Sequence, residues 1–333
     1  MIIQAMGILF SGGRGTTALQ TTLETQSSNA QPVDVSFQKS PIYLHQIPQE
    51  ALVDKTLTRK LRRADRFCKM AIIAASDALT DAHIDPADGK RTGIILATAI
   101  GPHRTTFRFL DDIREFGDAK GSPTIFSHSV HNAAASYVAK TLNLQGQSFT
   151  LTDFFFSFQQ ALLLAQCWLD EKQCDRVLIG SVDELGSVMQ YICSQKLTIA
   201  KDGQIKPLDF STKAQAVPGE ASVFMVLSNE QSSTAYANID NTLFSPSSRQ
   251  SSSTTPLLIE TDGLLSDESI YRRYSNAPLL AYSNSFGSIL SGSSLYCAAA
   301  ALMLKNQPNT THLQTLRYSP NKTSASIQLS KLT

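Results

Sequence analysis

The sequence predicts a layered α/β fold with a mostly parallel sheet, because short apolar runs alternate with helical patterns along much of the chain. Residues 94–99 and 176–180 are continuous apolar runs, as expected for strands buried on both faces. Near them, apolar side chains recur with helical spacing, for example at Phe158, Ala161, Leu162 and Ala165. This spacing predicts an amphipathic helix between two buried strands.

The elements expected in the first two-thirds of the chain follow this alternation. The expected strands are residues 1–10, 94–99, 149–152 and 176–180, and the expected helices are residues 16–25, 61–84, 107–116, 132–141 and the segment that starts at Phe158. Glycines at 12, 13 and 15 form a turn after the first strand. They lack the Lys-Ser/Thr of a P-loop and the full GxGxxG spacing, so we interpret them as a plain turn.

Residues 228–256 interrupt the pattern. Eight of the eleven residues from Ser245 to Thr255 are Ser or Thr, which is typical of a solvated loop or linker. We therefore expect an N-terminal half over 1–227, a linker over 228–256 and a shortened C-terminal half over 257–333. In that last part the pattern predicts strands at 257–261, 279–282 and 324–329, and an alanine-rich helix at 293–304.

Composition narrows the class of protein. Hydrophobic residues make up 42% of the 333 residues and charged residues 17%, and the net charge is +1, so we expect a folded chain without a basic surface for nucleic acid. Five scattered cysteines suit a reducing compartment. The first residues lack a basic region and cleavage site, and no run of about 18 apolar residues follows. We expect a cytoplasmic protein without a membrane span.

Several stretches between residues 61 and 227 carry a family resemblance. They are RRADRFCKMAIIAASDALTDAHI, RTGIILATAIGP, GSPTIFSHSVHNAAASYVAKTLNLQGQSFTLT, DRVLIGSVDELG and KPLDFSTKAQAVPGEASVFMVL. In this order they resemble the β-ketoacyl synthases of the thiolase fold, and Gly219-Glu220 matches the family's Gly-Glu-Gly turn. The resemblance implies α-β-α-β-α layers, with a truncated C-terminal half.

The resemblance also implies a nucleophilic cysteine where a strand meets the N-terminus of a buried helix, which lowers a thiol pKa. Gapless counting places Phe155 at that position. A phenyl ring cannot form a thioester. The nearest cysteine on the expected helix, Cys167, lies about three turns further on, and we interpret it as an inert core residue.

Two catalytic histidines of the family are also missing. In the stretch that matches the family's Glu-Ala-His-Gly motif, Asp262 takes the place of the first histidine. In the stretch that matches Lys-Ser-Asn-x-Gly-His, Ser283 replaces the lysine and Ser288 replaces the second histidine. The same stretch also resembles the family's later glycine-rich gating loop, although the helix that follows it favours the first registration. Under either registration no catalytic histidine is present, because the only histidine after residue 131 is His312.

Two further patterns have simpler interpretations. His128 and His131 could ligate a metal, but the sequence places no cysteine or acidic residue beside them, so we expect a loop or helix start. Ser157 has no GxSxG context, so we expect it to cap the helix that follows. No cofactor and no metal are expected.

The resemblance implies a non-catalytic chain-length factor that pairs with an active, cysteine-bearing synthase in polyketide, aryl polyene or fatty-acid-type chain elongation. An acyl carrier protein would take part only through that complex. Alternatives are a stand-alone acyl-binding protein with a phenylalanine-lined pocket, and an acyltransferase or decarboxylase that uses an unrecognised residue. Counting places Phe107, Phe109, Ile125 and Phe126 in the zones that close the partner's acyl tunnel, although core packing also explains large apolar residues there.

Overall fold

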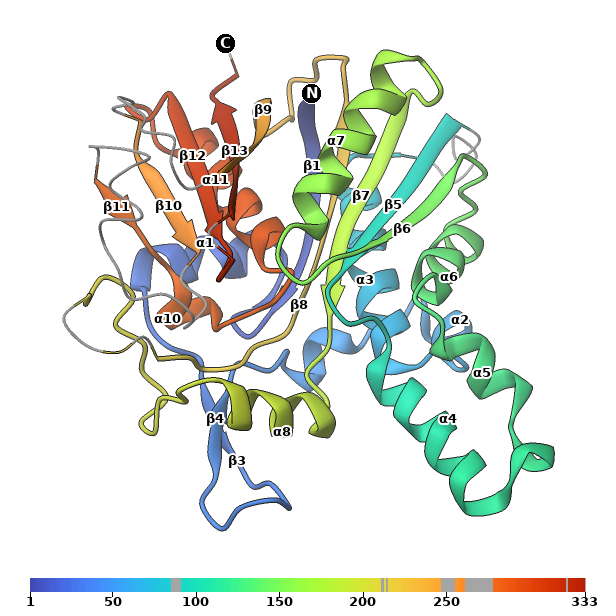
Figure 1. Ribbon diagram of the computed structural model, residues 1–333. Helices are drawn as coiled ribbons and strands as arrows, with labels where there is room; N and C mark the ends of the chain where they lie inside the picture. Colours follow the sequence, from blue (N-terminus) through green and yellow to red (C-terminus); the bar gives the residue numbers. More distant parts are fainter. Residues whose placement is uncertain are drawn as a thin grey trace.

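The computed structural model describes residues 1–84, 91–210, 213, 215–246, 255–260, 278–321 and 323–332. The main strands are β1 (Ile2–Phe10), β2 (Gly13–Arg14), β5 (Thr92–Thr98), β6 (Ser148–Thr152), β7 (Arg176–Asp183), β8 (Ala221–Ser228), β9 (Ala237–Pro246), β10 (Leu257–Glu260), β11 (Leu279–Leu280), β12 (His312–Tyr318) and β13 (Thr323–Ser330), and β3 (Gln31–Val33) pairs with β4 (Ile42–Leu44). The α-helices are α1 (Gly15–Thr25), α2 (Thr58–Leu61), α3 (Arg66–Asp81), α4 (His103–Phe116), α5 (Pro123–Ser129), α6 (Ala133–Thr141), α7 (Ser157–Asp170), α8 (Ser187–Lys196), α10 (Ser283–Phe286) and α11 (Ser293–Asn306). The arrangement is drawn in Figure 1.

The two halves of the chain use the same strand order. In the first half the order is β6-β5-β7-β8-β1, and in the second it is β11-β10-β12-β13-β9. A short antiparallel pairing of β1 with β9 joins them into one eleven-stranded sheet within the described residues. The first half spans residues 2–228 and the second only residues 237–330, so the same plan is built from fewer residues in the second half.

The sheet is mixed, which corrects the expectation of a mostly parallel one. The outer trios β6-β5-β7 and β11-β10-β12 are parallel. The inner strands β8, β1, β9 and β13 pair antiparallel with their neighbours. In the second half a short turn joins β12 to β13, and strands joined in this way can only be antiparallel.

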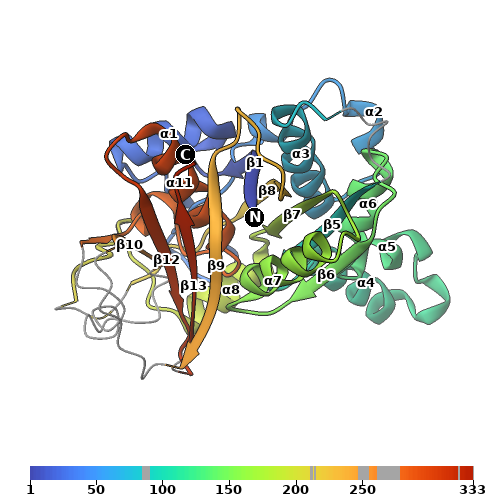
Figure 2. The same cartoon turned by 90° about the horizontal axis from the view of Figure 1, so that it is seen from above.

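Two helices lie between the halves. The buried residues of α7 and α11 share one core cluster with strands of both halves, and Figure 2 shows the sheet curving around this centre. On β8, Val223 and Met225 face this cluster, whereas Phe224 and Val226 face a second cluster with α3 and α6. The alternation follows from the period of two in a strand, so β8 is buried on both faces.

Close packing of α3 on the sheet depends on small residues. A Cβ added to Gly7 of β1 would lie 1.9 Å from the Ala74 carbonyl oxygen of α3, so no larger residue fits there. Ala71, Ala74, Ala75 and Ala78 are fully buried on α3. The helix of small residues expected over 61–84 is therefore present, as α3, and covers the outer face of the first half.

The region expected to be a linker contains a strand. β9 occupies Ala237–Pro246 and pairs antiparallel with β13. Ala237 and Ile239, at alternate positions near its start, lie in the core. The strand expected at 279–282 is shorter, since α10 begins at Ser283. On the outer face of the second half, among the described residues, Phe210 and Ala281 rather than a helix pack against Leu257, Ile259 and Leu316. None of the helices in the described ranges has the length and apolar character needed to cross a membrane.

Candidate active site and its altered residues

The junction between β6 and α7 is the position at which the resemblance implies a nucleophile. Asp153 follows β6, and its Oδ1 accepts hydrogen bonds from the backbone N–H groups of Phe155 and Phe156 at 2.8 and 2.7 Å. Asp153 therefore holds the turn that leads into α7. Ser157 was expected to do this, but it is the first residue of α7 and is buried, with no partner for its Oγ among the described residues. The helix-cap prediction for Ser157 is wrong.

The phenylalanine run at this junction has members in different environments. Phe156 and Phe158 are buried, Phe155 is partly buried and Phe154 is exposed. The ring of Phe155 faces the guanidinium of Arg317, whose Cζ lies 5.9 Å from the ring centroid. The side chain at the expected nucleophile position therefore contacts a buried cation and offers no nucleophilic atom.

Arg317 belongs to a buried polar chain that sequence reasoning missed. Its Nη1 lies 3.0 Å from Oε2 of Glu260, and both side chains are at most 2% exposed. The same Oε2 accepts a hydrogen bond from Ser293 at 2.8 Å, and Gln159 of α7 donates to Ser293 Oγ at 2.8 Å. Glu260 and Arg317 are register partners in the parallel pair β10–β12, so the sheet itself places the two charges together.

Two of the remaining positions, Ser283 and Ser288, lie within the described residues. Asp262 lies outside the described residues. Ser283 is buried at the start of α10, and Ser288 forms an isolated bridge with Pro218 through its backbone. The stretch leads into α11, as the registration with the Lys-Ser-Asn-x-Gly-His motif requires.

One histidine not singled out from the sequence lies beside this stretch. A Cβ on Gly287, which has φ of +83°, would lie 2.8 Å from the Cβ of His45. His45 Nδ1 is 2.9 Å from Ser11 Oγ. Burial lowers the pKa of His45 to about 4, so the ring is neutral near pH 7.

The four tunnel candidates lie on α4 and α5, at one side of the molecule (Figure 1). Phe107 and Phe126 are exposed, Phe109 and Ile125 are partly buried, and none of the four belongs to a hydrophobic core cluster. The rings of Phe109 and Phe126 pack together with centroids 5.4 Å apart. Packing in the hydrophobic core, the simpler explanation for large apolar residues at these four positions, therefore does not hold.

The two histidines considered for a metal lie in different surroundings. His128 of α5 is buried beside Asp65 and Cys68, which the sequence places about sixty residues earlier. His131 is exposed and packs against Gly101, where an added Cβ would lie 2.5 Å from its Cδ2. The expectation that no cysteine or acidic residue lies near these histidines is therefore wrong for His128, because the fold brings the start of α3 close to α5. Cys167, expected in the core, is exposed on α7.

Comparisons with known proteins agree with this geometry. The family model for "Beta-ketoacyl synthase, N-terminal domain" matches residues 1–233. No curated protein matches the chain. Among solved structures, the chain is similar to the ishigamide ketosynthase/chain length factor, with a TM-score of 0.81, 16% identity, and coverage of 100% of this chain and 99% of that chain.

Two further solved structures are similar. A beta-ketoacyl synthase from Burkholderia phymatum STM815 has a TM-score of 0.84 and 14% identity, with 100% and 99% of the two chains covered. A complex of a type II polyketide synthase acyl-carrier protein with its ketosynthase bound to the hexaketide gives 0.77 and 13%, with 99% of both chains covered. At such identities the likeness establishes the fold, which is the thiolase-like α/β fold that the sequence predicted.

Proposed function

Because this chain belongs to the beta-ketoacyl synthase family by its match over residues 1–233, we propose that it is a non-catalytic chain-length-factor subunit. In this role it pairs with an active, cysteine-bearing synthase and shapes the synthase's acyl tunnel. The observation that carries the proposal is Phe155 at the N-terminal end of α7, with the Arg317 guanidinium against its ring. A condensing enzyme needs a thiolate at this point to hold the acyl chain.

The buried polar groups near Phe155 support the proposal that this protein does not catalyse condensation. Condensation requires groups that stabilise a developing oxyanion and assist decarboxylation. Near Phe155 the structure instead places an Arg317–Glu260 ion pair, hydrogen-bonded through Ser293 to Gln159. These groups are bonded to one another within the fold. Their role in this proposal is to hold β10, β12, α7 and α11 together.

The edge strand β6 of the first half supports the proposal that this protein binds a partner. β6 is the last strand in the sheet order, and β5 is its one partner within the described part of the chain. An edge strand leaves backbone N–H and C=O groups that a second chain can pair. Phe149 on β6 is 49% exposed. Phe107 and Phe126 are also exposed, and their helices α4 and α5 lie on the same side of the molecule as β6 (Figure 1). Exposed large apolar side chains on one side of a protein are typical of a surface that another protein covers.

The tunnel role rests on α4 and α5. Phe109, Phe126 and Ile125 belong to α4 and α5. These two helices lie on the same side of the molecule as β6 (Figure 1), and the rings of Phe109 and Phe126 pack together. When the synthase covers this side, these three side chains lie where they can limit the space for the growing acyl chain. The acyl carrier protein would deliver its units to the partner. Polyketide, aryl polyene or fatty-acid-type elongation is the proposed setting, and a cytoplasmic location stays a prediction.

Co-expression with a synthase that retains its cysteine and histidines, encoded beside this gene, tests the pairing. Size-exclusion chromatography with light scattering is expected to show a one-to-one heterodimer. Phe149→Asp is expected to weaken that complex, because it places a charge on the β6 edge. Leu208→Asp is the matched control, since Leu208 is similarly exposed, at 45%, but lies outside α4, α5 and β6. A monomer that ignores the synthase would contradict the proposal.

A further inference from the structure

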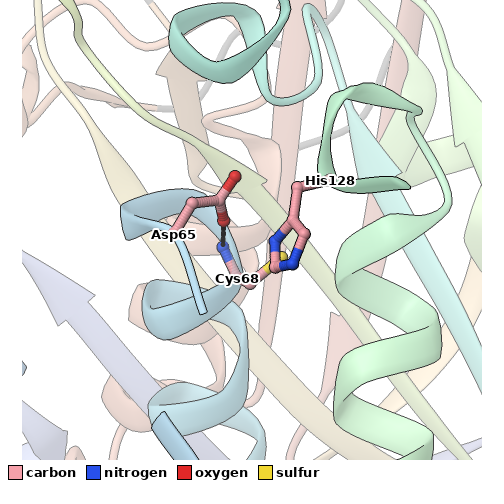
Figure 3. Close-up of side chains that lie close together, drawn as sticks. All are labelled: Asp65, Cys68 and His128. Carbon is pink, nitrogen blue, oxygen red and sulfur yellow. Dashed lines mark hydrogen bonds between the residues drawn. The ribbon is translucent and has the colours of Figure 1, made fainter. Parts of the chain in front are cut away.

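Three side chains with metal-binding chemistry meet between α3 and α5. Asp65 precedes α3, Cys68 lies in its first turn, and His128 lies on α5. Their ligand atoms all lie within 4.8 Å of one another. Figure 3 shows the imidazole of His128 beside Cys68, with one ring nitrogen on the side of Cys68 and Asp65.

Neighbouring hydrogen bonds orient the donors. Thr105 donates its hydroxyl to Asp65 Oδ2 at 2.6 Å, while Oδ1 accepts the backbone N–H of Cys68 at 2.8 Å. The Tyr137 hydroxyl lies 2.6 Å from His128 Nε2. When the tyrosine oxygen accepts the Nε2 proton, Nδ1 keeps its lone pair free for a ligand. Metal-binding histidines are commonly oriented in this way through their second nitrogen.

The environment of His128 Nδ1 is the observation that points to a ligand. His128 is only 4% exposed, and its Nδ1 has no hydrogen-bond partner among the described residues. A buried polar atom without a partner carries a free-energy cost, because it has lost its hydrogen bonds to water. Nδ1 lies on a ring whose other nitrogen is already bonded, so a ligand between His128, Cys68 and Asp65 would remove this cost.

We propose that Asp65, Cys68 and His128 form a zinc site that joins α3 to α5. One thiolate, one imidazole and one carboxylate are all established zinc ligands, and three protein ligands leave a fourth position open. On binding, the Cys68 thiol releases its proton to solvent and a zinc–sulfur bond forms, with no change of oxidation state. Ligand atoms around tetrahedral zinc lie about 3.3–3.6 Å apart, so any pair separated by more than this must move closer when zinc binds.

Burial, together with the neighbouring Asp65 carboxylate, raises the pKa of the Cys68 thiol above its usual range. Zinc must therefore displace the thiol proton when it binds. The zinc site would pin α5, which also carries Ile125 and Phe126, against the first half of the sheet.

Metal analysis of the full-length chain tests the site. After loading with Zn²⁺ and removal of free metal, the wild-type chain is expected to retain a single zinc ion, and the Co²⁺-loaded chain is expected to show a thiolate charge-transfer band in the near ultraviolet. Cys68→Ala and His128→Gln are expected to lose both signals. The matched controls His131→Gln and Cys193→Ala are expected to keep them, because His131 is exposed and Cys193 lies on α8.

X-ray absorption at the zinc edge of the wild-type chain decides the question even where a variant fails to fold. One sulfur neighbour with nitrogen or oxygen neighbours is the expected result. A wild-type chain that retains no zinc, a coordination sphere without sulfur, or folded Cys68→Ala and His128→Gln variants with unchanged metal content would overturn the proposal.

Discussion

Replacing Arg317 with methionine tests the buried ion pair beside Phe155. Arg317 is 1% exposed and Glu260 is 2% exposed, and their N–O distance is 3.0 Å. The methionine removes the guanidinium but keeps much of the volume, so the buried Glu260 carboxylate loses its ion pair with Arg317. Breaking one partner of such a pair costs about 3–5 kcal/mol, because the remaining charge cannot be solvated. We expect a loss of unfolding free energy of this size.

Two matched variants separate burial from charge. Arg91 forms an ion pair with Asp175 on the surface, where both side chains are at least 50% exposed. Arg91→Ala is expected to change the unfolding free energy little, because solvent screens an exposed ion pair. The double variant Arg317→Met with Glu260→Gln removes both charges, so it is expected to be more stable than Arg317→Met alone.

Urea unfolding followed by circular dichroism at pH 7 measures these differences. The free energies are compared at a common slope with urea concentration, so that a change in midpoint reports a change in stability. A cost below about 1 kcal/mol for Arg317→Met, no larger than that of Arg91→Ala, would refute the reasoning. It would mean that the Glu260 charge is stabilised without the guanidinium.

Three further predictions concern pH, product length and packing. Burial lowers the pKa of both His45 and His103 to about 4, so as pH falls below about 6.5 the unfolded chain binds protons first. The stability that the two neutral rings contribute is full above that pH and lost towards pH 4, and the urea midpoints of His45→Gln should fall less steeply between these pH values than those of the wild type. In the reconstituted complex, Phe126→Ala is expected to lengthen the products by one or more two-carbon units, and an unchanged length distribution with the complex intact would remove Phe126 as a gate. Gly180→Ala would place a Cβ 2.4 Å from the ring of Phe224, and this overpacking is expected to cost about 1–3 kcal/mol, which an unchanged thermal midpoint would contradict.

The alternating pattern predicted most of the first half of the fold, and the misses have physical causes. β12 was not expected, because its buried residues include Gln314, Thr315 and Arg317, which a hydropathy pattern reads as solvent-facing. β9 lies next to the Ser/Thr-rich stretch, which concealed a short apolar alternation at Ala237 and Ile239. In both strands, partners far away in the chain supply the environment that the local sequence does not indicate.

In the candidate site, only the features that depend on local sequence patterns could be predicted. The strand and the helix on either side of Phe155 were predicted, since both elements have clear local patterns, and Phe155 lies in the turn between them. The Arg317–Glu260 pair depends on the register of β10 with β12, which no local pattern encodes. The meeting of Cys68 with His128 depends on the packing of α5 near α3, so no local pattern indicates the contact between these two distant residues.

Intact-protein mass spectrometry of the reconstituted complex tests the central claim most directly. The complex of this chain with its active synthase is incubated with acyl-carrier-protein thioesters, and the mass of each chain is measured in the same spectrum. The account predicts an acyl adduct on the synthase and an unmodified mass for this chain, because Phe155 offers no nucleophile. A stable acyl adduct on this chain would contradict it.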